Sequence, residues 1–173
     1  GPKGCGFLYA DKNTGIKPFI YGGGQERGQR SGTENVPGIL GMVKAAEISH
    51  RIMDENNRKL RKINDYMTDR ILNEIDDCIC NGNRENRLSN NVSFGNIDGK
   101  ALLVLLDMEG VYVSGASACN GGKEKSYVLS SLGVPEKYAD GTIRMTMDYT
   151  MNMKQADYVL NVLKKCVNYL RKK

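Results

Sequence analysis

The second half of the chain alternates short strand-like segments with helix-like segments, and this alternation constrains its fold more than any other feature. Four segments have the short apolar or alternating pattern of strands: residues 78–80, 90–94, 111–114 and 141–147. Three segments carry apolar residues at helical spacing: residues 99–110, 126–133 and 153–173. Strands interleaved with helices in this way predict an α/β fold, in which helices cover one sheet.

The first half of the chain has a different pattern. A short apolar run at residues 4–12 predicts a buried strand. Residues 13–38 are rich in glycine and polar residues and have no regular period, and long segments of this kind usually carry function. Helical spacing of apolar residues begins at about Val36, with Asn35 as the expected N-cap. A polar run at residues 54–57 predicts a bend or a boundary between lobes.

Composition excludes several classes of partner. The chain has 173 residues, of which 40% are hydrophobic and 26% charged, as in an ordinary globular protein. No apolar run approaches the roughly 18 residues that span a bilayer, so no membrane is expected. The net charge of +5 is spread along helical segments without a basic-aromatic motif, so no nucleic acid is expected. Five cysteines, an odd number without framework spacing, predict a reducing and therefore cytoplasmic location.

The sequence "GASACNGG" places Cys119 among small residues after an expected strand. Buried structural cysteines usually lie inside a strand or a helix, so this context favours an exposed thiol. A reactive thiolate would need a basic neighbour, and Lys123 and Lys125 are close in sequence. From the residues alone, Cys119 is either a reactive group on a loop or a small residue that fills a turn.

Arg144 lies inside the expected strand "GTIRMTM", between two apolar residues. It is therefore either at a sheet edge with its guanidinium in water, or buried and paired. Buried arginines commonly hold a carboxylate or phosphate through two parallel hydrogen bonds.

The stretch "GGGQERGQRSGTEN" is similar to an anion-binding loop, because glycines precede Arg30, Ser31 and Thr33 and a helix follows. It is not a P-loop, since the Gly-Lys-Ser/Thr ending is missing. The alternative is a solvated loop whose charges pair with each other. No metal site is expected, because Cys78 and Cys80 have no second pair.

Six blocks occur in the order seen in cysteine desulfurases, which the sequence resembles over its whole length: "GPKGCGFLYA", "GGGQERGQRSGTENVPGILG", "NNVSF", "VSGASAC", "SYVLSSLG" and "GTIRMTM". Cysteine desulfurases are pyridoxal-phosphate enzymes of the class V aminotransferase fold. The "S-A-C" loop is similar to that of the group that supplies sulfur for iron–sulfur cluster assembly.

This resemblance implies a role for three residues. Cys119 matches the catalytic cysteine, whose thiolate takes sulfur from L-cysteine and leaves L-alanine and an enzyme persulfide. Arg144 matches the arginine that holds the substrate α-carboxylate. Thr33 matches the threonine whose hydroxyl reaches the phosphate of pyridoxal 5'-phosphate in the partner subunit, which implies a homodimer. The persulfide is expected to pass to an iron–sulfur scaffold or another sulfur-acceptor protein.

The resemblance also implies that the chain is a C-terminal portion. The lysine that forms the Schiff base with the cofactor has no match here, and Lys3 in "GPKG" is not its equivalent. Residues 1–52 are expected to hold the last strand, the loop and the connecting helix of the large cofactor-binding domain. Residues 53–173 are expected to form the small C-terminal α/β domain of the pyridoxal-phosphate-dependent transferase fold, a mostly antiparallel sheet packed with helices. The isolated chain is expected to be inactive.

Two other functions remain open at this stage. One is a selenocysteine lyase or a related β-eliminating enzyme of the same fold. The other is a non-catalytic module that carries sulfur on Cys119 or binds a scaffold protein.

Overall fold

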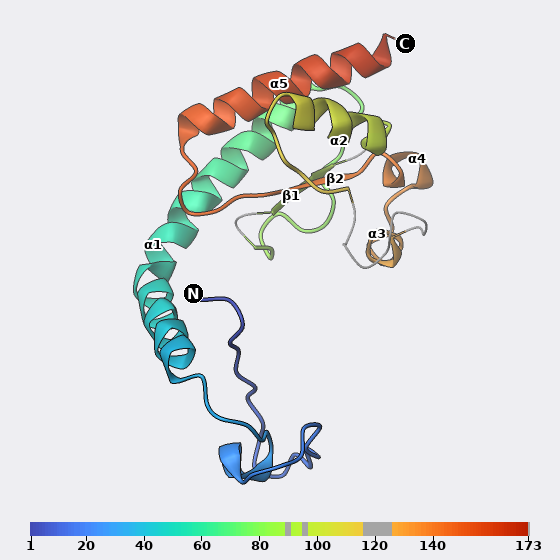
Figure 1. Cartoon of the computed structure of the whole chain (residues 1–173). Coiled ribbons are helices and arrows are strands. Elements are labelled where there is room, and N and C mark those ends of the chain that lie inside the picture. Colours follow the sequence, from blue (N-terminus) through green and yellow to red (C-terminus); the bar gives the residue numbers. More distant parts are fainter. Residues whose placement is uncertain (89–90, 95–96, 116–125, 173) are drawn as a thin grey trace. The chain divides into compact units, whose positions relative to one another are not determined.

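The computed structural model describes residues 1–88, 91–94, 97–115 and 126–172 (Figure 1). The chain divides into two compact units, Gly1–Met53 and Asp54–Lys173. A single long helix, α1 (Val36–Glu74), contributes residues to both units. None of the described helices combines the length and apolar character needed to cross a membrane.

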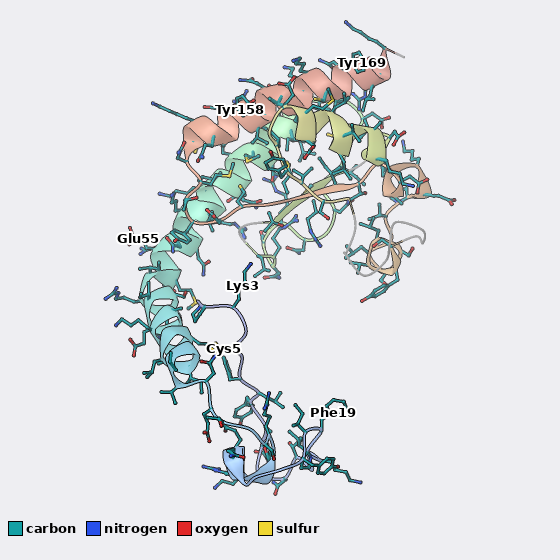
Figure 2. All side chains as sticks on the ribbon, in the orientation of Figure 1. Lys3, Cys5, Phe19, Glu55, Tyr158 and Tyr169 are labelled. Carbon is teal, nitrogen blue, oxygen red and sulfur yellow. The ribbon has the colours of Figure 1, made fainter. Side chains whose placement is uncertain are left out.

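The unit Gly1–Met53 consists of irregular chain, one turn of 3-10 helix, η1 (Gln25–Gly28), and the first half of α1. The strand expected at residues 4–12 is wrong, because this segment has no regular secondary structure. Its apolar side chains are open to solvent, with Phe7 82% and Tyr9 84% exposed. A strand is stabilised by hydrogen bonds to a neighbouring strand, and the described part of the chain provides none to this segment. Phe19 also projects into solvent from the loop that follows (Figure 2).

Helix α1 begins where the sequence predicted it. The Oδ1 atom of Asn35 accepts a hydrogen bond from the Gly38 amide at 3.1 Å, which caps the first turn. Of the two alternatives at residues 54–57, the bend is absent, since α1 continues through them without interruption, whereas the division between the two units falls at Met53/Asp54. The run is polar but contains neither proline nor glycine, so nothing removes or weakens the backbone hydrogen bonds there.

A small antiparallel sheet lies in the unit Asp54–Lys173. Strands β1 (Asn91–Phe94) and β2 (Ile143–Thr146) pair in register, with Ser93 opposite Arg144. The expected strand at residues 111–114 is reduced to one antiparallel bridge, between Ser114 and Arg144. The expected strand at residues 78–80 is wrong, because that segment has no strand partner among the described residues.

Helices α1, α2 (Gly99–Met108) and α5 (Met153–Arg171) cover one face of this sheet (Figure 1). The core consists of apolar side chains from the second half of α1, from α2, from β2 and from α5. Its completely or almost completely buried members are Met67, Ile71, Leu102, Leu106, Ile143, Leu163 and Val167. The short helices α3 (Tyr127–Ser131) and α4 (Glu136–Ala139) contribute no buried residue.

Local capping residues fix the ends of these helices. Asp98 accepts hydrogen bonds from the amides of residues 100 and 101 and caps α2. Asn152 and Gln155 form a reciprocal capping box at the start of α5. Gly110 ends the α2 segment with a φ of 73°, a left-handed conformation that glycine adopts without steric cost. The helices expected at residues 99–110, 126–133 and 153–173 are therefore confirmed.

A polar cluster links α1 to α5 on the surface. The Tyr66 hydroxyl donates a hydrogen bond to Asp157 Oδ1 at 2.5 Å, and this bond raises the pKa of Tyr66. Arg70 donates to the Tyr66 hydroxyl at 2.6 Å and also pairs with Glu74. The hydrogen bond from Arg70 holds the pKa of the Glu74 carboxyl below its usual value, and Lys164 adds to this effect.

Candidate functional site

Arg144 lies on the strand at the centre of the small sheet. Its backbone pairs with Ser93 of β1 on one side and with Ser114 on the other. The Arg144 amide donates to the Ser114 carbonyl at 2.6 Å, and the Ser114 amide donates to the Arg144 carbonyl at 3.0 Å. Pairing on both sides fixes the Arg144 backbone in a way that a sheet edge would not.

The side chain of Arg144 points away from the core. Along β2, residues 143 and 145 are buried and residues 144 and 146 are exposed, as expected for a strand with one covered face. The Arg144 guanidinium makes no hydrogen bond or ion pair with any residue that the structure describes. No described residue thus occupies its five donors, and this planar set of donors matches a carboxylate or a phosphate.

The segment that carries Cys119 leaves the sheet beside Arg144. Ser114 is bonded to Arg144, and Gly115 follows it directly. A Cβ atom at Gly115 would lie 3.1 Å from Leu103 Cδ1, so glycine allows this backbone to lie close to α2. Cys119 itself lies outside the described residues, as do Lys123 and Lys125.

The glycine-rich loop closes on the hydroxyl of Ser31. This residue is only 5% exposed and donates a hydrogen bond to the Gly23 carbonyl at 2.7 Å. The Gln25 side chain accepts from the Gly32 amide at 3.2 Å. Arg30 donates to the carbonyl of Ser31 at 2.5 Å. Two of the three anion ligands considered from the sequence, Arg30 and Ser31, therefore make bonds within the loop.

Thr33 is the third of these residues, and it is exposed. Its hydroxyl makes no hydrogen bond to a described residue, so it remains able to donate to an anion. Glu26 and Arg27 in the same loop have φ values of 50° and 57°, which are uncommon for residues other than glycine. Thr33 belongs to the unit Gly1–Met53 and Arg144 belongs to the unit Asp54–Lys173.

The cysteine pair at residues 78 and 80 is not arranged for metal binding. Cys78 Sγ donates to the Ile75 carbonyl at 3.1 Å, and burial raises the pKa of its thiol. Cys80 Sγ accepts a hydrogen bond from Arg87 at 3.1 Å. Within the part of the chain that the structure describes, no three His, Cys, Asp or Glu side chains are grouped to hold an ion.

Sequence reasoning missed the role of Ser114 as the backbone partner of Arg144. The only signal was the expected strand at residues 111–114, and nothing in the sequence states which strand lies beside it. It also missed a groove lined by five basic side chains, for which the run "RKLRK" was the available signal.

Comparison with known proteins assigns the chain to a family. Residues 1–159 match the family Aminotransferase class-V. The chain belongs to the class-V aminotransferase family. The chain is 44% identical to the cysteine desulfurase IscS of Dictyoglomus turgidum over 174 residues. This match covers 99% of the chain and 44% of the relative. The chain is 42% identical to the cysteine desulfurase IscS of Methanosarcina thermophila, covering 99% of the chain and 43% of the relative.

Solved structures give the same result for the fold. A NifS-like protein matches with a TM-score of 0.81 and 33% identity, covering 94% of the chain and 42% of that protein. A NifS-like protein from Rickettsia africae matches with a TM-score of 0.73 and 28% identity, covering 90% of the chain and 41% of that protein. The expected transferase fold and the resemblance to cysteine desulfurases are thus confirmed. The class-V aminotransferase chain spans less than half the length of the curated relatives that it matches.

Proposed function

We propose that the whole protein is a cysteine desulfurase, to which this chain contributes Cys119, Arg144 and Thr33. The observation that carries the proposal is Arg144, whose guanidinium has no partner among the described residues and which is bridged to Ser114, just before the segment that contains Cys119. The names of the curated relatives support the same reaction class.

Arg144 binds the α-carboxylate of L-cysteine in this proposal. Two parallel N–H···O bonds from a guanidinium to a carboxylate fix both the position and the orientation of the substrate. The hydrogen bonds to Ser114 and the pairing with β1 hold the Arg144 backbone, so the bound carboxylate has a defined place. Orientation of this kind lowers the entropic cost of the chemical step.

Cys119 acts as the nucleophile. Its thiolate attacks the sulfur of L-cysteine, an S–S bond forms and the Cβ–S bond breaks. The carbon gains a proton, so that the products are L-alanine and a persulfide on Cys119. Cys119 lies five positions after Ser114, and five residues of extended chain span at most about 18 Å. The thiol is therefore tethered within reach of the substrate that Arg144 would hold.

Pyridoxal 5'-phosphate, when bound, supplies the electron sink that makes the Cβ–S bond labile. The exposed hydroxyl of Thr33, which has no partner among the described residues, fits a phosphate ligand, and we propose that it donates to the cofactor of the partner subunit in a homodimer. No residue of the chain matches the lysine that holds the cofactor, so we expect the isolated chain to release no alanine.

We propose that the persulfide passes to an iron–sulfur scaffold or another sulfur-acceptor protein in the cytoplasm. The four described cysteines are free thiols, which supports a reducing location.

Replacement of Arg144 tests the carboxylate site. In the full-length enzyme, Arg144→Lys removes the bidentate geometry and retains the charge, so KM for L-cysteine should rise about 10- to 100-fold. Arg84→Lys, on an exposed arginine that pairs with Asp69, is the matched control and should leave KM unchanged. An unchanged KM in Arg144→Lys would contradict this role.

Replacement of Cys119 tests the nucleophile and separates the rival functions. Cys119→Ala should lower alanine formation from L-cysteine by about 1000-fold or more and abolish the persulfide, whereas Cys80→Ala should retain both. Full activity of Cys119→Ala on selenocysteine, with little activity of the wild type on cysteine, would instead identify a selenocysteine lyase. A full-length protein that forms no alanine would support the non-catalytic module.

A further inference from the structure

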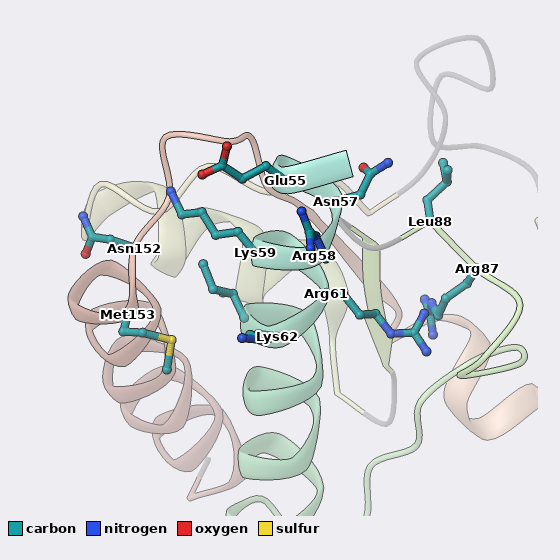
Figure 3. A pocket seen from close by; sticks show the side chains of 11 residues that line it. Glu55, Asn57, Arg58, Lys59, Arg61, Lys62, Arg87, Leu88, Asn152 and Met153 are labelled. Atoms are coloured by element: carbon teal, nitrogen blue, oxygen red, sulfur yellow. The ribbon is translucent and has the colours of Figure 1, made fainter. Parts of the chain in front are cut away.

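A basic groove lies along α1 within the unit Asp54–Lys173 (Figure 3). Its volume is ≈ 1020 Å³. Five cationic side chains and one carboxylate line it: Arg58, Lys59, Arg61, Lys62, Arg87 and Glu55. Four of the cations belong to α1, where they lie within two consecutive turns of the helix. None of these residues belongs to the site proposed for desulfuration.

The positive charge of the groove is compensated only in part: Glu55 is the one acidic residue among its described lining residues, and the charge of Lys59 contributes to the lowered pKa of Asp148. Arg61 pairs with Asp65 at 3.3 Å, but the other four cations form no ion pair with a described residue. The contacts that they do make are with neutral groups: Lys59 Nζ donates to the Tyr149 carbonyl at 2.7 Å, and Arg58 Nε donates to the Asp54 carbonyl at 3.3 Å. Hydrogen bonds to carbonyl oxygens leave the positive charge available to an anionic ligand.

Arg87 lines the groove from outside α1. Its Nη1 atom donates to the Asn81 carbonyl at 3.2 Å and to Cys80 Sγ at 3.1 Å. Its Nε atom is buried and has no hydrogen-bond partner in the described chain. The hydrogen bonds of Nη1 hold the Arg87 side chain at the groove and do not neutralise its charge.

The groove also has an apolar component. Leu88 is 75% exposed and Met153 is 44% exposed, and both line the groove near its cations. Ile63 lies at its base and is 3% exposed. The methylene stems of the lysines and arginines extend this apolar surface. A ligand that matches the groove therefore combines carboxylates with apolar side chains.

We propose that this basic groove binds an acidic segment of a partner protein. Asp or Glu side chains of the segment pair with Arg58, Lys59, Lys62 and Arg87, and an apolar side chain between them packs on Leu88. None of the described residues that line the groove is aromatic, so these residues offer no stacking platform of the kind found in single-stranded nucleic acid sites. The proposal does not rest on the desulfurase activity.

A synthetic peptide tests the basic groove in the full 173-residue chain. The probe is a fluorescent 12-residue peptide of Asp, Glu and Leu, and its neutral counterpart has Asn and Gln in place of the acids. The acidic peptide should bind, and its affinity should fall with added salt. The double variant Arg58→Glu/Lys62→Glu should weaken binding at least about 10-fold, because each reversal replaces an attraction with a repulsion.

The matched control is Lys100→Glu/Lys172→Glu, which changes the net charge equally at two exposed positions outside the groove. It should change the affinity less than about 2-fold, and circular dichroism should show both variants folded. Equal binding by the two double variants, or equal binding of the neutral peptide, would overturn the proposal. Binding of an oligonucleotide or of anionic vesicles that depends on Arg58 and Lys62, without binding of the peptide, would overturn it as well.

Discussion

In the unit Asp54–Lys173, 17 buried apolar side chains form one cluster, drawn from three helices and from the β2 region. In the unit Gly1–Met53, all of whose residues are described, the only buried residue is the polar Ser31. The unit Asp54–Lys173 therefore gains hydrophobic stabilisation within the chain, while the unit Gly1–Met53 is held by backbone hydrogen bonds, caps and the Ser31–Gly23 contact. Apolar burial and loop hydrogen bonding thus act in separate parts of one molecule.

The largest expected effect comes from the core. Leu163 is 0% exposed, so Leu163→Ala should lower the free energy of unfolding of the unit Asp54–Lys173 by about 2–5 kcal/mol. Leu40→Ala, at a helical leucine that is 64% exposed, should cost less than about 1 kcal/mol. Urea unfolding followed by circular dichroism measures both. Equal losses would show that the two units share one core.

Removal of a helix cap should also cost more stability in the unit Asp54–Lys173 than in the unit Gly1–Met53. Asn152→Ala removes the capping box of α5 and should lower the free energy of global unfolding by about 1 kcal/mol, because α5 contributes to the core. Asn35→Ala removes the cap of α1 in a part of the helix that buries no apolar side chain. It should fray the first turn and leave the urea midpoint unchanged. A shift of that midpoint by Asn35→Ala would contradict the comparison.

The loop hydrogen bond should have a local effect. Ser31→Ala leaves the Gly23 carbonyl without its donor and should cost about 1 kcal/mol of local stability. Trypsin cleavage after Arg27 and Arg30 should become about 5-fold faster, while the unfolding of the other unit stays the same. Ser49→Ala, an exposed serine of the same unit, is the control. Unchanged cleavage in Ser31→Ala would show that the hydroxyl does not hold the loop.

The smallest expected effect is a pH dependence confined to the unit with the core. Hydrogen bonding from Arg70 lowers the pKa of Glu74 in the folded state, so the unfolded state binds more protons as the pH falls. The contribution of Glu74 to stability is present above its unfolded pKa of 4.5 and is lost as the pH falls through the folded value. Glu74→Gln should therefore flatten the decline of the urea midpoint below about pH 4.5. An identical decline in wild type and variant would exclude this contribution.

Local sequence signals predicted several elements correctly. A cap predicted the start of α1 at Val36, a glycine predicted the end of the α2 segment at Gly110, and alternating apolar residues predicted β2. Each of these signals acts over a few residues. The strand expected at residues 4–12 failed, because a strand exists only where a partner supplies hydrogen bonds. At residues 54–57, where the sequence left a bend or a lobe boundary open, the bend is absent because polarity by itself does not break a helix, and the division between the two units falls there.

The candidate site, too, was predictable only in part from local sequence. The sequence alone identified Arg144, Thr33 and Cys119 by residue type, glycine-rich context and resemblance. It left Arg144 open between a sheet edge and a buried pair, and neither description holds in the structure. Only tertiary structure placed Arg144 on a central strand with its guanidinium on the open face, because strand order and facing depend on pairing between segments about 30 to 50 residues apart.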